Sequence, residues 1–299
     1  MAITAAEFQL LLEPKLSNIW HDEQPSEEEV YPKLFNVRDM DKNTITDARM
    51  AGFGSLQNQP DGDEVVYDDP IAPETKAYTY AVRALGYRIH DRIWRYDLYG
   101  EVERFERDLM DSAKDDAETA AASIFNNGFT TTNTGFDGLA LFSTSHTRMD
   151  GGTAQANRSS TEGALSLSAL HSATITIDKW KNERGRPRTW NPKYLVVPSD
   201  LMHVADELLL SNLKPGTANN DKNVISRYDM QRLRWKYLTS TTAWFIGCDK
   251  HDLNFFWAFR PETGMETEFD TETIKRKVRQ GRVTGFGAPL GVFGDDGVA

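Results

Sequence analysis

The chain has 299 residues, of which 39% are hydrophobic and 26% charged, so it can bury a large core and is not a disordered tail. One cysteine, Cys248, excludes an intrachain disulfide and a multi-cysteine zinc cluster, and the sequence shows neither a membrane-spanning apolar run nor a signal peptide. With 45 acidic against 34 basic residues the net charge is -11. This charge argues against a free-standing DNA-binding domain, but not against a protein that surrounds DNA.

Residues 1–36 predict an arm that needs a neighbour for its stability. Apolar side chains at helical spacing over residues 8–20 indicate an amphipathic helix. An acidic, proline-containing segment follows, with carboxylates at Glu27, Glu28 and Glu29. Because this segment is too polar to fold by itself, we expect it to contact another subunit.

Residues 37–92 predict a long projecting hairpin. Strand-like runs at 44–53 and 78–89 flank a turn-rich centre, and a phase slip at Ala84, beside Gly86, indicates a β-bulge in the second run. The centre carries an Asp-Gly turn signal and little core-forming content, which suits a hairpin that lies on another subunit. Its acidic residues, which we expect to contact that subunit, are Asp61, Asp63 and Glu64.

The strongest helical pattern lies between Leu98 and Asn127, where apolar side chains recur on one face and charges fill the other. Asn127-Gly128 is a typical C-terminal stop. About 30 residues at ~1.5 Å per residue predict a rod of ~45 Å. A helix more than twice the usual length is expected to organise the whole subunit.

The second half of the chain orders its helices and strands in a way that favours an α+β fold. Residues 130–163 are rich in Thr, Gly, Asn and Ser and predict loops. One helix is expected to start near Ser166 or Ser168 and to end near residue 181, and another is expected to be capped by Ser199 or Asp200. The expected strands are 194–197, an edge strand at Leu238, 244–247, 253–259 and 267–280.

No combination of residues meets the requirements of a catalytic, cofactor or metal site. Ser145 beside His146 lacks the motif of a nucleophile elbow, and the six histidines lack the spacing of a zinc-binding helix. The glycine-rich segment 285–291 has the wrong spacing for a dinucleotide fingerprint and predicts a C-terminal loop. We therefore expect no enzyme activity, cofactor or metal, and a hydrolase that uses Ser145 and His146 is the weaker alternative.

One basic cluster lies near the C-terminus, on a predicted strand. Three interpretations are open: a charged strand face, a contact with nucleic acid, or pairing with acidic segments of a neighbouring subunit such as 27–29 or 61–64. The candidate residues for contact with another subunit are Lys275, Arg276, Lys277 and Arg279, with Arg282 beside them.

Four segments, in their order along the chain, are similar to one known family. They are 136–146 (FDGLALFSTSH), 185–187 (GRP), 194–198 (YLVVP) and 244–247 (WFIG). Each is short, but the ordered set resembles the major capsid proteins of tailed bacteriophages that are related to the Mu-like major head subunit. The resemblance covers about residues 98–290.

The resemblance implies the Hong Kong 97-type capsid fold, which is α+β. It implies an N-terminal arm at 1–36, an extended loop with flanking strands at 37–92, a peripheral domain with a long spine helix at 93–165, an axial domain at 166–261, and a return to the peripheral domain with a C-terminal loop at 262–299. Some family members join a Lys to an Asn covalently. Lys76 is the only lysine within residues 44–89 of the hairpin, and nothing marks an acidic catalyst for it, so we expect non-covalent contacts.

The function implied by the resemblance is that of a major capsid protein. Such a protein assembles with itself, as pentamers and hexamers, into the icosahedral head shell of the virion, which encloses double-stranded DNA without sequence-specific contact. Assembly in the host bacterial cytoplasm would involve a separate scaffolding protein, a portal and possible decoration proteins, and no membrane. The alternative is an encapsulin-like cargo compartment on the same fold. The length of the predicted helix speaks against another phage structural protein, such as a tail-tube subunit.

Overall fold

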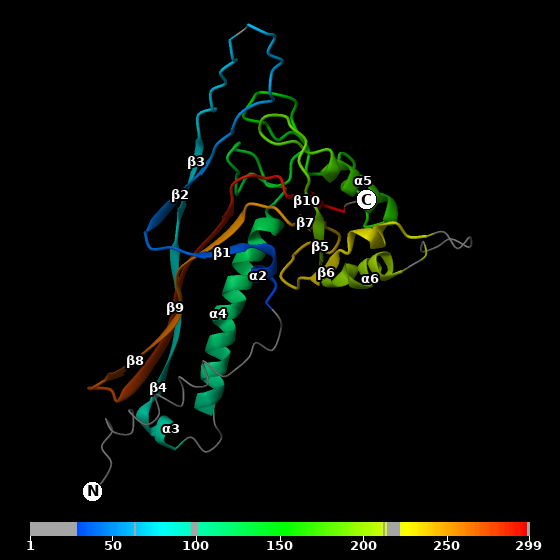
Figure 1. Cartoon of the computed structure of the whole chain (residues 1–299). Coiled ribbons are helices and arrows are strands. Elements are labelled where there is room, and N and C mark those ends of the chain that lie inside the picture. Colours follow the sequence, from blue (N-terminus) through cyan, green and yellow to red (C-terminus); the bar gives the residue numbers. More distant parts are fainter. Residues whose placement is uncertain (1–28, 63, 97–100, 212, 214–221, 298–299) are drawn as a thin grey trace.

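Strand pairing divides the chain into a long sheet, a compact sheet and a two-stranded ribbon in this computed structural model (Figure 1). The structure describes residues 29–62, 64–96, 101–211, 213 and 222–297. The long sheet has the order β1-β8-β9-β4, in which β1 is parallel to β8 and the other pairs are antiparallel. Its strands are β1 (Asn36–Asp39), β4 (Ala81–His90), β8 (Leu253–Glu268) and β9 (Thr273–Phe286).

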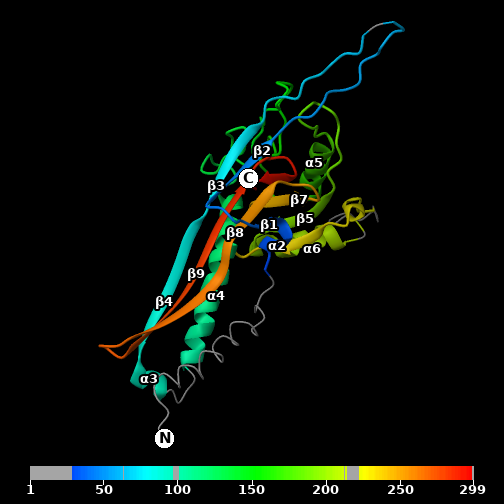
Figure 2. The same ribbon diagram turned by 60° about the vertical axis from the view of Figure 1, so that its left-hand side comes forward.

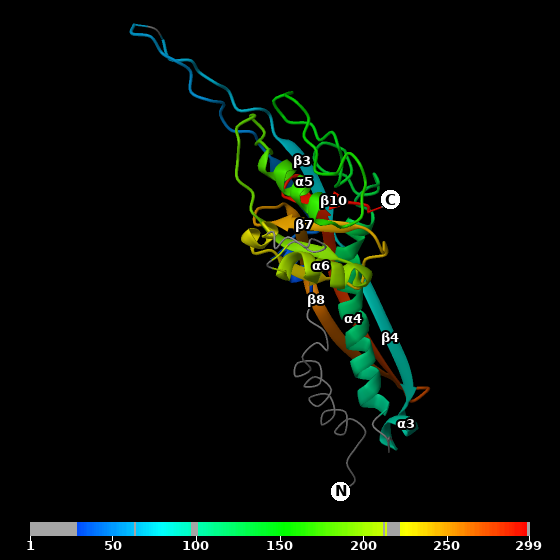
Figure 3. The ribbon, with the colours of Figure 1, turned by 90° about the vertical axis from the view of Figure 1, so that its right-hand side faces the viewer.

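Helix α4 (Glu101–Asn126) lies along the long sheet and packs on β9 (Figures 1, 2 and 3). Leu109 of this helix is buried against Val278 of β9, and Ala121 is fully enclosed. The predicted long helix is confirmed over these residues, and its expected first turn at 97–100 lies outside the described part. None of the described helices is both long and apolar enough to cross a bilayer.

The compact sheet has the order β10-β7-β5-β6 and lies beside helices α5 (Leu167–Asp178) and α6 (Met202–Leu210). Helix α5 begins as predicted, because the Ser166 hydroxyl accepts a hydrogen bond from the Ala169 amide at 3.2 Å. Its strands are β5 (Pro192–Val197), β6 (Gln231–Arg234), β7 (Trp244–Cys248) and β10 (Val292–Asp295). The short helical segments of the chain are α2 (Tyr31–Leu34), α3 (Asp91–Arg95), η1 (Ser199–Leu201) and η2 (Ile225–Tyr228).

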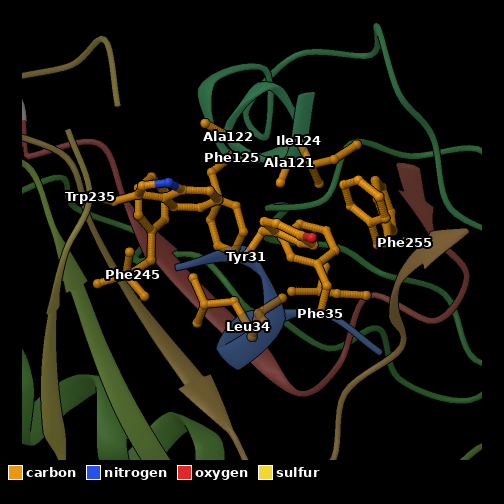
Figure 4. Close-up of a cluster of buried hydrophobic side chains, with 14 of the residues drawn as sticks. Tyr31, Leu34, Phe35, Ala121, Ala122, Ile124, Phe125, Trp235, Phe245 and Phe255 are labelled. Atoms are coloured by element: carbon orange, nitrogen blue, oxygen red, sulfur yellow. The ribbon is translucent and has the colours of Figure 1, made fainter. Parts of the chain in front are cut away.

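A shared hydrophobic core joins both sheets to α4 (Figure 4). Tyr31 stacks on Phe255 with ring centroids 4.6 Å apart, and Phe35 meets Phe125 edge-on at 6.1 Å. Phe125 in turn contacts Phe245 of β7 at 5.1 Å. Tyr31 and Phe35, which the sequence analysis placed in the arm, therefore belong to the core of the subunit.

A hairpin is present where one was predicted, as the ribbon of β2 (Thr44–Arg49) and β3 (Glu74–Thr79), but its second strand was placed wrongly. Most of the run predicted at 78–89 is β4, which pairs with β9 in the long sheet and not with β2. Strands β2 and β3 pair antiparallel over their full length. Between them, the described residues of 50–73 form neither helix nor strand and project beyond the body of the subunit (Figures 1 and 2). The distal hairpin therefore has no secondary structure of its own to stabilise it.

The predicted β-bulge near Gly86 is wrong. The β4–β9 register runs unbroken from Ala81 opposite Arg282 to His90 opposite Thr273. A Cβ at Gly86 would lie 2.5 Å from the carbonyl oxygen of Arg276, so the glycine marks a close approach of two backbones.

Two predictions around the compact sheet are also wrong. The segment at Leu238 is a turn, in which its amide donates to the Trp235 carbonyl, and the edge strand is β6. Neither Ser199 nor Asp200 caps α6, since both lie in η1 and the N-cap residue is Leu201. Polar residues after Pro198 start a tight 3-10 turn here before the helix begins.

The C-terminal strands extend further than their apolar runs predict. Strand β8 continues to Glu268, so the strand expected from residue 267 starts only at Thr273. The glycine-rich end is not only a loop, because β10 follows Gly291 and joins the compact sheet. The division into five domains stays a prediction, and its boundary between residues 261 and 262 falls inside β8.

Cys248 should be chemically silent in the folded protein. It is 1% exposed, and burial, aided by the charge of Asp249, raises the pKa of its thiol to about 12. At neutral pH we expect no maleimide labelling of the native chain and full labelling in denaturant, as measured by mass spectrometry. A Leu56→Cys variant, at a fully exposed position, should react at once. Equal labelling rates for both thiols would contradict the burial of Cys248.

Candidate assembly surfaces

The distal hairpin exposes apolar and acidic side chains together. Asp61 and Glu64 are exposed, and Asp63 lies outside the described residues. The large apolar side chains exposed on the hairpin are Met50, Phe53, Leu56, Val65, Val66 and Tyr67. Such a concentration of exposed apolar side chains is typical of a surface that another protein covers.

The base of the hairpin is held in place by the loop around residues 182–186. Arg49 pairs with Glu74 at 2.5 Å and with Glu183 at 2.9 Å. The Arg184 Nε donates to the carbonyl oxygen of Gly52 at 2.7 Å, and the Arg186 guanidinium donates to that of Phe53 at 2.8 Å. The hairpin therefore leaves the body in a defined direction. These contacts could not be predicted from the sequence, because backbone carbonyl acceptors leave no pattern in the side chains.

Lys76 uses its amine within its own subunit. The Nζ atom donates to the carbonyl oxygens of Phe286, at 2.9 Å, and Thr134, and it lies 4.9 Å from the centre of the Phe286 ring. Burial lowers the pKa of this ammonium group. These contacts are unfavourable for the covalent crosslink considered in the sequence analysis, since the amine is already held by its own chain.

The predicted basic cluster lies on β9, where alternate side chains point to opposite faces. Arg276 points toward α4, is 4% exposed, and makes a two-pronged ion pair with Glu106 at 2.7 and 3.0 Å. Arg276 is therefore a buried structural residue of its own subunit and not an available surface. Its neighbours differ: Lys275 pairs with Glu268 at 2.9 Å, Arg279 pairs with Glu262 at 3.0 Å, Arg282 pairs with Asp116 at 2.7 Å, and Lys277 is exposed.

Contact of Lys275, Lys277 and Arg279 with another subunit stays a prediction. All three point away from α4, and the ion pairs of Lys275 and Arg279 are partly exposed. Exposed ion pairs contribute little to stability, so these side chains are free to exchange partners at an interface.

The segment at which the predicted arm joins the body is anchored on Glu118 of α4. One carboxylate oxygen accepts from the amides of Val30, at 2.7 Å, and Tyr31, at 3.3 Å, and the other accepts from the Trp235 indole at 2.7 Å. Burial raises the pKa of Glu118, and the three donors oppose that shift. Glu118 thus ties the arm junction to the spine helix and to the compact sheet.

Beside this anchor lies an open groove of about 720 Å³. Glu29, one of the predicted contact residues, lines it together with Lys33 and Lys114, whereas Glu27 and Glu28 lie outside the described residues. The groove carries charges of both signs, which gives it no single preferred class of ligand.

The Ser145–His146 pair has a structural role. The Nδ1 atom of His146 contacts the Asp137 carboxylate at 2.6 Å, and Nε2 contacts the Asn157 side-chain oxygen at 3.0 Å. Burial is the largest single influence and opposes the ionisation of Asp137, but His146, the Leu139 amide and the charge of Arg49 together outweigh it and hold the pKa of Asp137 below its usual value. Because both ring nitrogens are engaged, this histidine is not placed to activate Ser145.

The Asp137–His146–Asn157 network holds the long loops of residues 130–163 together. The Asn157 amide group donates to the carbonyl oxygens of Leu141, at 2.7 Å, and Pro289, at 3.1 Å. Within the part of the chain that the structure describes, no group of three or more His, Cys, Asp or Glu side chains could hold a metal ion. His146 is thus a buried polar support for the loops, whereas Ser145 beside it is exposed.

Comparison with known families decides the class of this protein. The family model described as phage capsid protein matches residues 73–293, which is most of the chain. The chain belongs to the phage capsid protein family. A phage capsid protein is a structural component of the virion head.

Solved structures with the same fold are phage capsids. The chain is similar to the capsid of bacteriophage JBD30 decorated with minor capsid protein trimers, at 14% identity and a TM-score of 0.58, over 80% of this chain and 100% of that one. It is similar to the cyanophage P-SCSP1u capsid at 12% identity and a TM-score of 0.58, over 91% and 89% of the two chains. For Mycobacterium phage Che8 the identity is 10% and the TM-score 0.53, over 91% and 93%.

At such low identities these similarities concern the fold, and they confirm the α+β, Hong Kong 97-type capsid fold expected from the resemblance. A search of curated proteins found no match.

Removal of the Arg276 guanidinium should be costly. Arg276→Ala leaves the Glu106 carboxylate buried without its cationic partner, although the Tyr87 hydroxyl still donates to it, and we expect a loss of about 3–5 kcal/mol in the free energy of unfolding. The measurement is denaturant unfolding of the unassembled subunit. Arg279→Ala, on the same strand, removes only an exposed pair and should cost less than about 1 kcal/mol. Equal losses would show that the α4–β9 ion pair is not buried.

Removal of the Glu118 carboxylate should loosen the arm junction. Glu118→Ala leaves the Val30 and Tyr31 amides and the Trp235 indole without this acceptor, at a cost of roughly 1–3 kcal/mol. We also expect faster proteolysis near residues 29–35. The matched control is Asp115→Ala on the same helix, where an exposed carboxylate binds the Tyr237 hydroxyl, and it should leave both readings unchanged. A wild-type cleavage rate in the Glu118 variant would contradict the anchor.

Proposed function

We propose that this capsid protein is the major subunit of the head shell, and that it assembles with copies of itself, as pentamers and hexamers, into a closed icosahedral container. The family match over residues 73–293 carries this proposal. The distal hairpin supports it, since its apolar side chains are buried only when another molecule covers them.

A shell subunit must make several different contacts at once. Heterologous contacts close into rings, and the hairpin and the arm connect one subunit to the next. Interfaces of ~1,600 Å² each are individually modest, but a closed shell holds every subunit by many of them. The contacts would be non-covalent, in keeping with the amine of Lys76, which is hydrogen-bonded within its own subunit.

The enclosed molecule would be the double-stranded DNA of a tailed phage, held without sequence-specific contact. The net charge of -11 favours a lining that repels phosphate and lets DNA slide. The role would be structural and not catalytic, which agrees with the engaged ring nitrogens of His146.

Assembly would involve a separate scaffolding protein and a portal, and decoration proteins are suggested by the decorated capsid of bacteriophage JBD30. An encapsulin-like compartment is the alternative. Cargo peptides that co-purify with empty shells would favour the compartment, whereas packaged DNA would favour the phage head.

Electron microscopy of the purified protein tests the proposal. We expect closed shells from the full chain. Replacement of residues 51–72 by Gly-Gly should leave a folded subunit, because β2 and β3 still pair, but it should abolish closed shells. Circular dichroism and the silent thiol of Cys248 serve as controls for folding. Normal shells from the shortened chain would refute the role of the hairpin, and a monomer from the full chain would refute the proposed function.

A further inference from the structure

Within the part of the chain that the structure describes, strand β4 is an open edge of the long sheet. It pairs with β9 on one side and ends the strand order on the other. Residues 81–86 are all exposed, and Val82 and Leu85 are each 55% exposed although apolar. A row of backbone donors and acceptors with apolar side chains beside it is a template for another strand.

The β4 edge is basic. Over residues 81–95 the sequence contains one acidic residue, Asp91, which pairs with Arg95. Arg83 and Arg88 are exposed on the strand itself. A strand that docks here should therefore be acidic, with apolar residues between its charges.

The return limb of the hairpin has this composition. From residue 50 to residue 75 the acidic residues are Asp61, Asp63, Glu64, Asp68, Asp69 and Glu74, and the sequence has no basic residue there. Val65, Val66 and Tyr67 are strong strand formers, yet they are exposed and form no strand. The Asp-Gly turn before Glu64 and Pro70 after Asp69 set the limits of the segment.

The spacings match. Glu64 and Asp69 lie five residues apart, as do Arg83 and Arg88. An antiparallel pairing that places Glu64 opposite Arg88 places Asp69 opposite Arg83. The same register sets Tyr67 beside Leu85, at a notch of about 230 Å³ that Leu85, Ala113 and Val278 help to line.

A subunit cannot make this pairing with itself. The distal hairpin lies at one end of the elongated subunit, and β4 extends toward the other end, in the views of Figures 1 and 2. The hairpin base is also fixed by Arg186 and by Arg184. Arg184 pairs with Asp68 at 3.4 Å and donates to the carbonyl oxygen of Asp69, so the end of the return limb is held by its own subunit. The partner must be another molecule.

We propose that residues 64–69 of one copy add to the β4 edge of a neighbouring copy as a fifth, antiparallel strand of the long sheet, with Tyr67 beside Leu85. This inference rests on the proposed function and gives the hairpin a specific receptor. The acidic hairpin and the basic strand edge are then two halves of one contact.

Disulfide trapping in assembled shells tests the register. In a Tyr67→Cys/Leu85→Cys variant the two positions are directly opposed between copies, at a spacing close to that of a disulfide. On a non-reducing gel we expect a ladder of crosslinked subunits. The native Cys248 does not interfere, because it is buried.

The matched control is Tyr67→Cys/Ala84→Cys, in which the second cysteine is also exposed but points to the other face of the sheet. It should give little crosslinking. Shells of normal size with no ladder, or with equal ladders from both variants, would overturn the inference. If the unsubstituted chain forms no shells, the proposed function fails instead.

If the cysteine variants do not assemble, exchanging the charges of Arg88 and Glu64 provides a second test of the same register. Arg88→Glu or Glu64→Arg alone should prevent shells, because each places like charges opposite one another in the proposed register. The two changes together should restore shells. Absence of rescue, with both single variants folded, would overturn the pairing.

Discussion

The contact between α4 and β9 is the constraint on which the rest of the subunit depends. A two-pronged ion pair between Glu106 and Arg276 crosses it, and Leu109 and Val278 fill the space beside that pair. Buried charges are tolerated only in such a paired geometry, so the register of the helix on the strand is strongly specified. Because α4 and the long sheet stiffen each other, the subunit can extend projecting segments from both ends without a larger core.

The largest core cluster lies around the C-terminal part of α4, and the projections are left outside it. Phe125 gathers Phe35, Phe245 and Trp235 around the end of α4, where the two sheets meet. In contrast, the distal hairpin holds exposed Leu56 and the edge strand holds exposed Leu85. Apolar side chains that an isolated subunit leaves in water are those that assembly would bury, and this distribution is expected of a protein whose final state is a lattice.

The features predicted from sequence are those that depend on local pattern. The charge and apolar periodicity of α4, the Ser166 cap and the buried run at 194–197 each reflect a nearby constraint, and each is confirmed. The features that escaped prediction depend on distant partners. From sequence alone Gly86 indicates a β-bulge, whereas its cause is the close approach of the Arg276 carbonyl oxygen. The groups that donate hydrogen bonds to Glu118 lie far from it in the sequence. For the same reason, the sequence could place charges at Arg276 and Arg279 but not tell the buried one from the exposed one.

The charges on the β4 edge also bear on which contacts the subunit avoids. An open edge strand could pair with the same strand of a second copy and lead to uncontrolled aggregation. If the β4 strands of two copies paired antiparallel in the register that brings Arg83 opposite Arg88, these like charges would repel each other. Pairing of the distal hairpin with the same segment of a second copy is disfavoured too, because residues 50–75 carry only acidic charges. Because the distal hairpin is acidic and the β4 edge is basic, pairing of either element with its own copy is disfavoured, and pairing of the hairpin with β4 is favoured. A regular shell requires this selectivity.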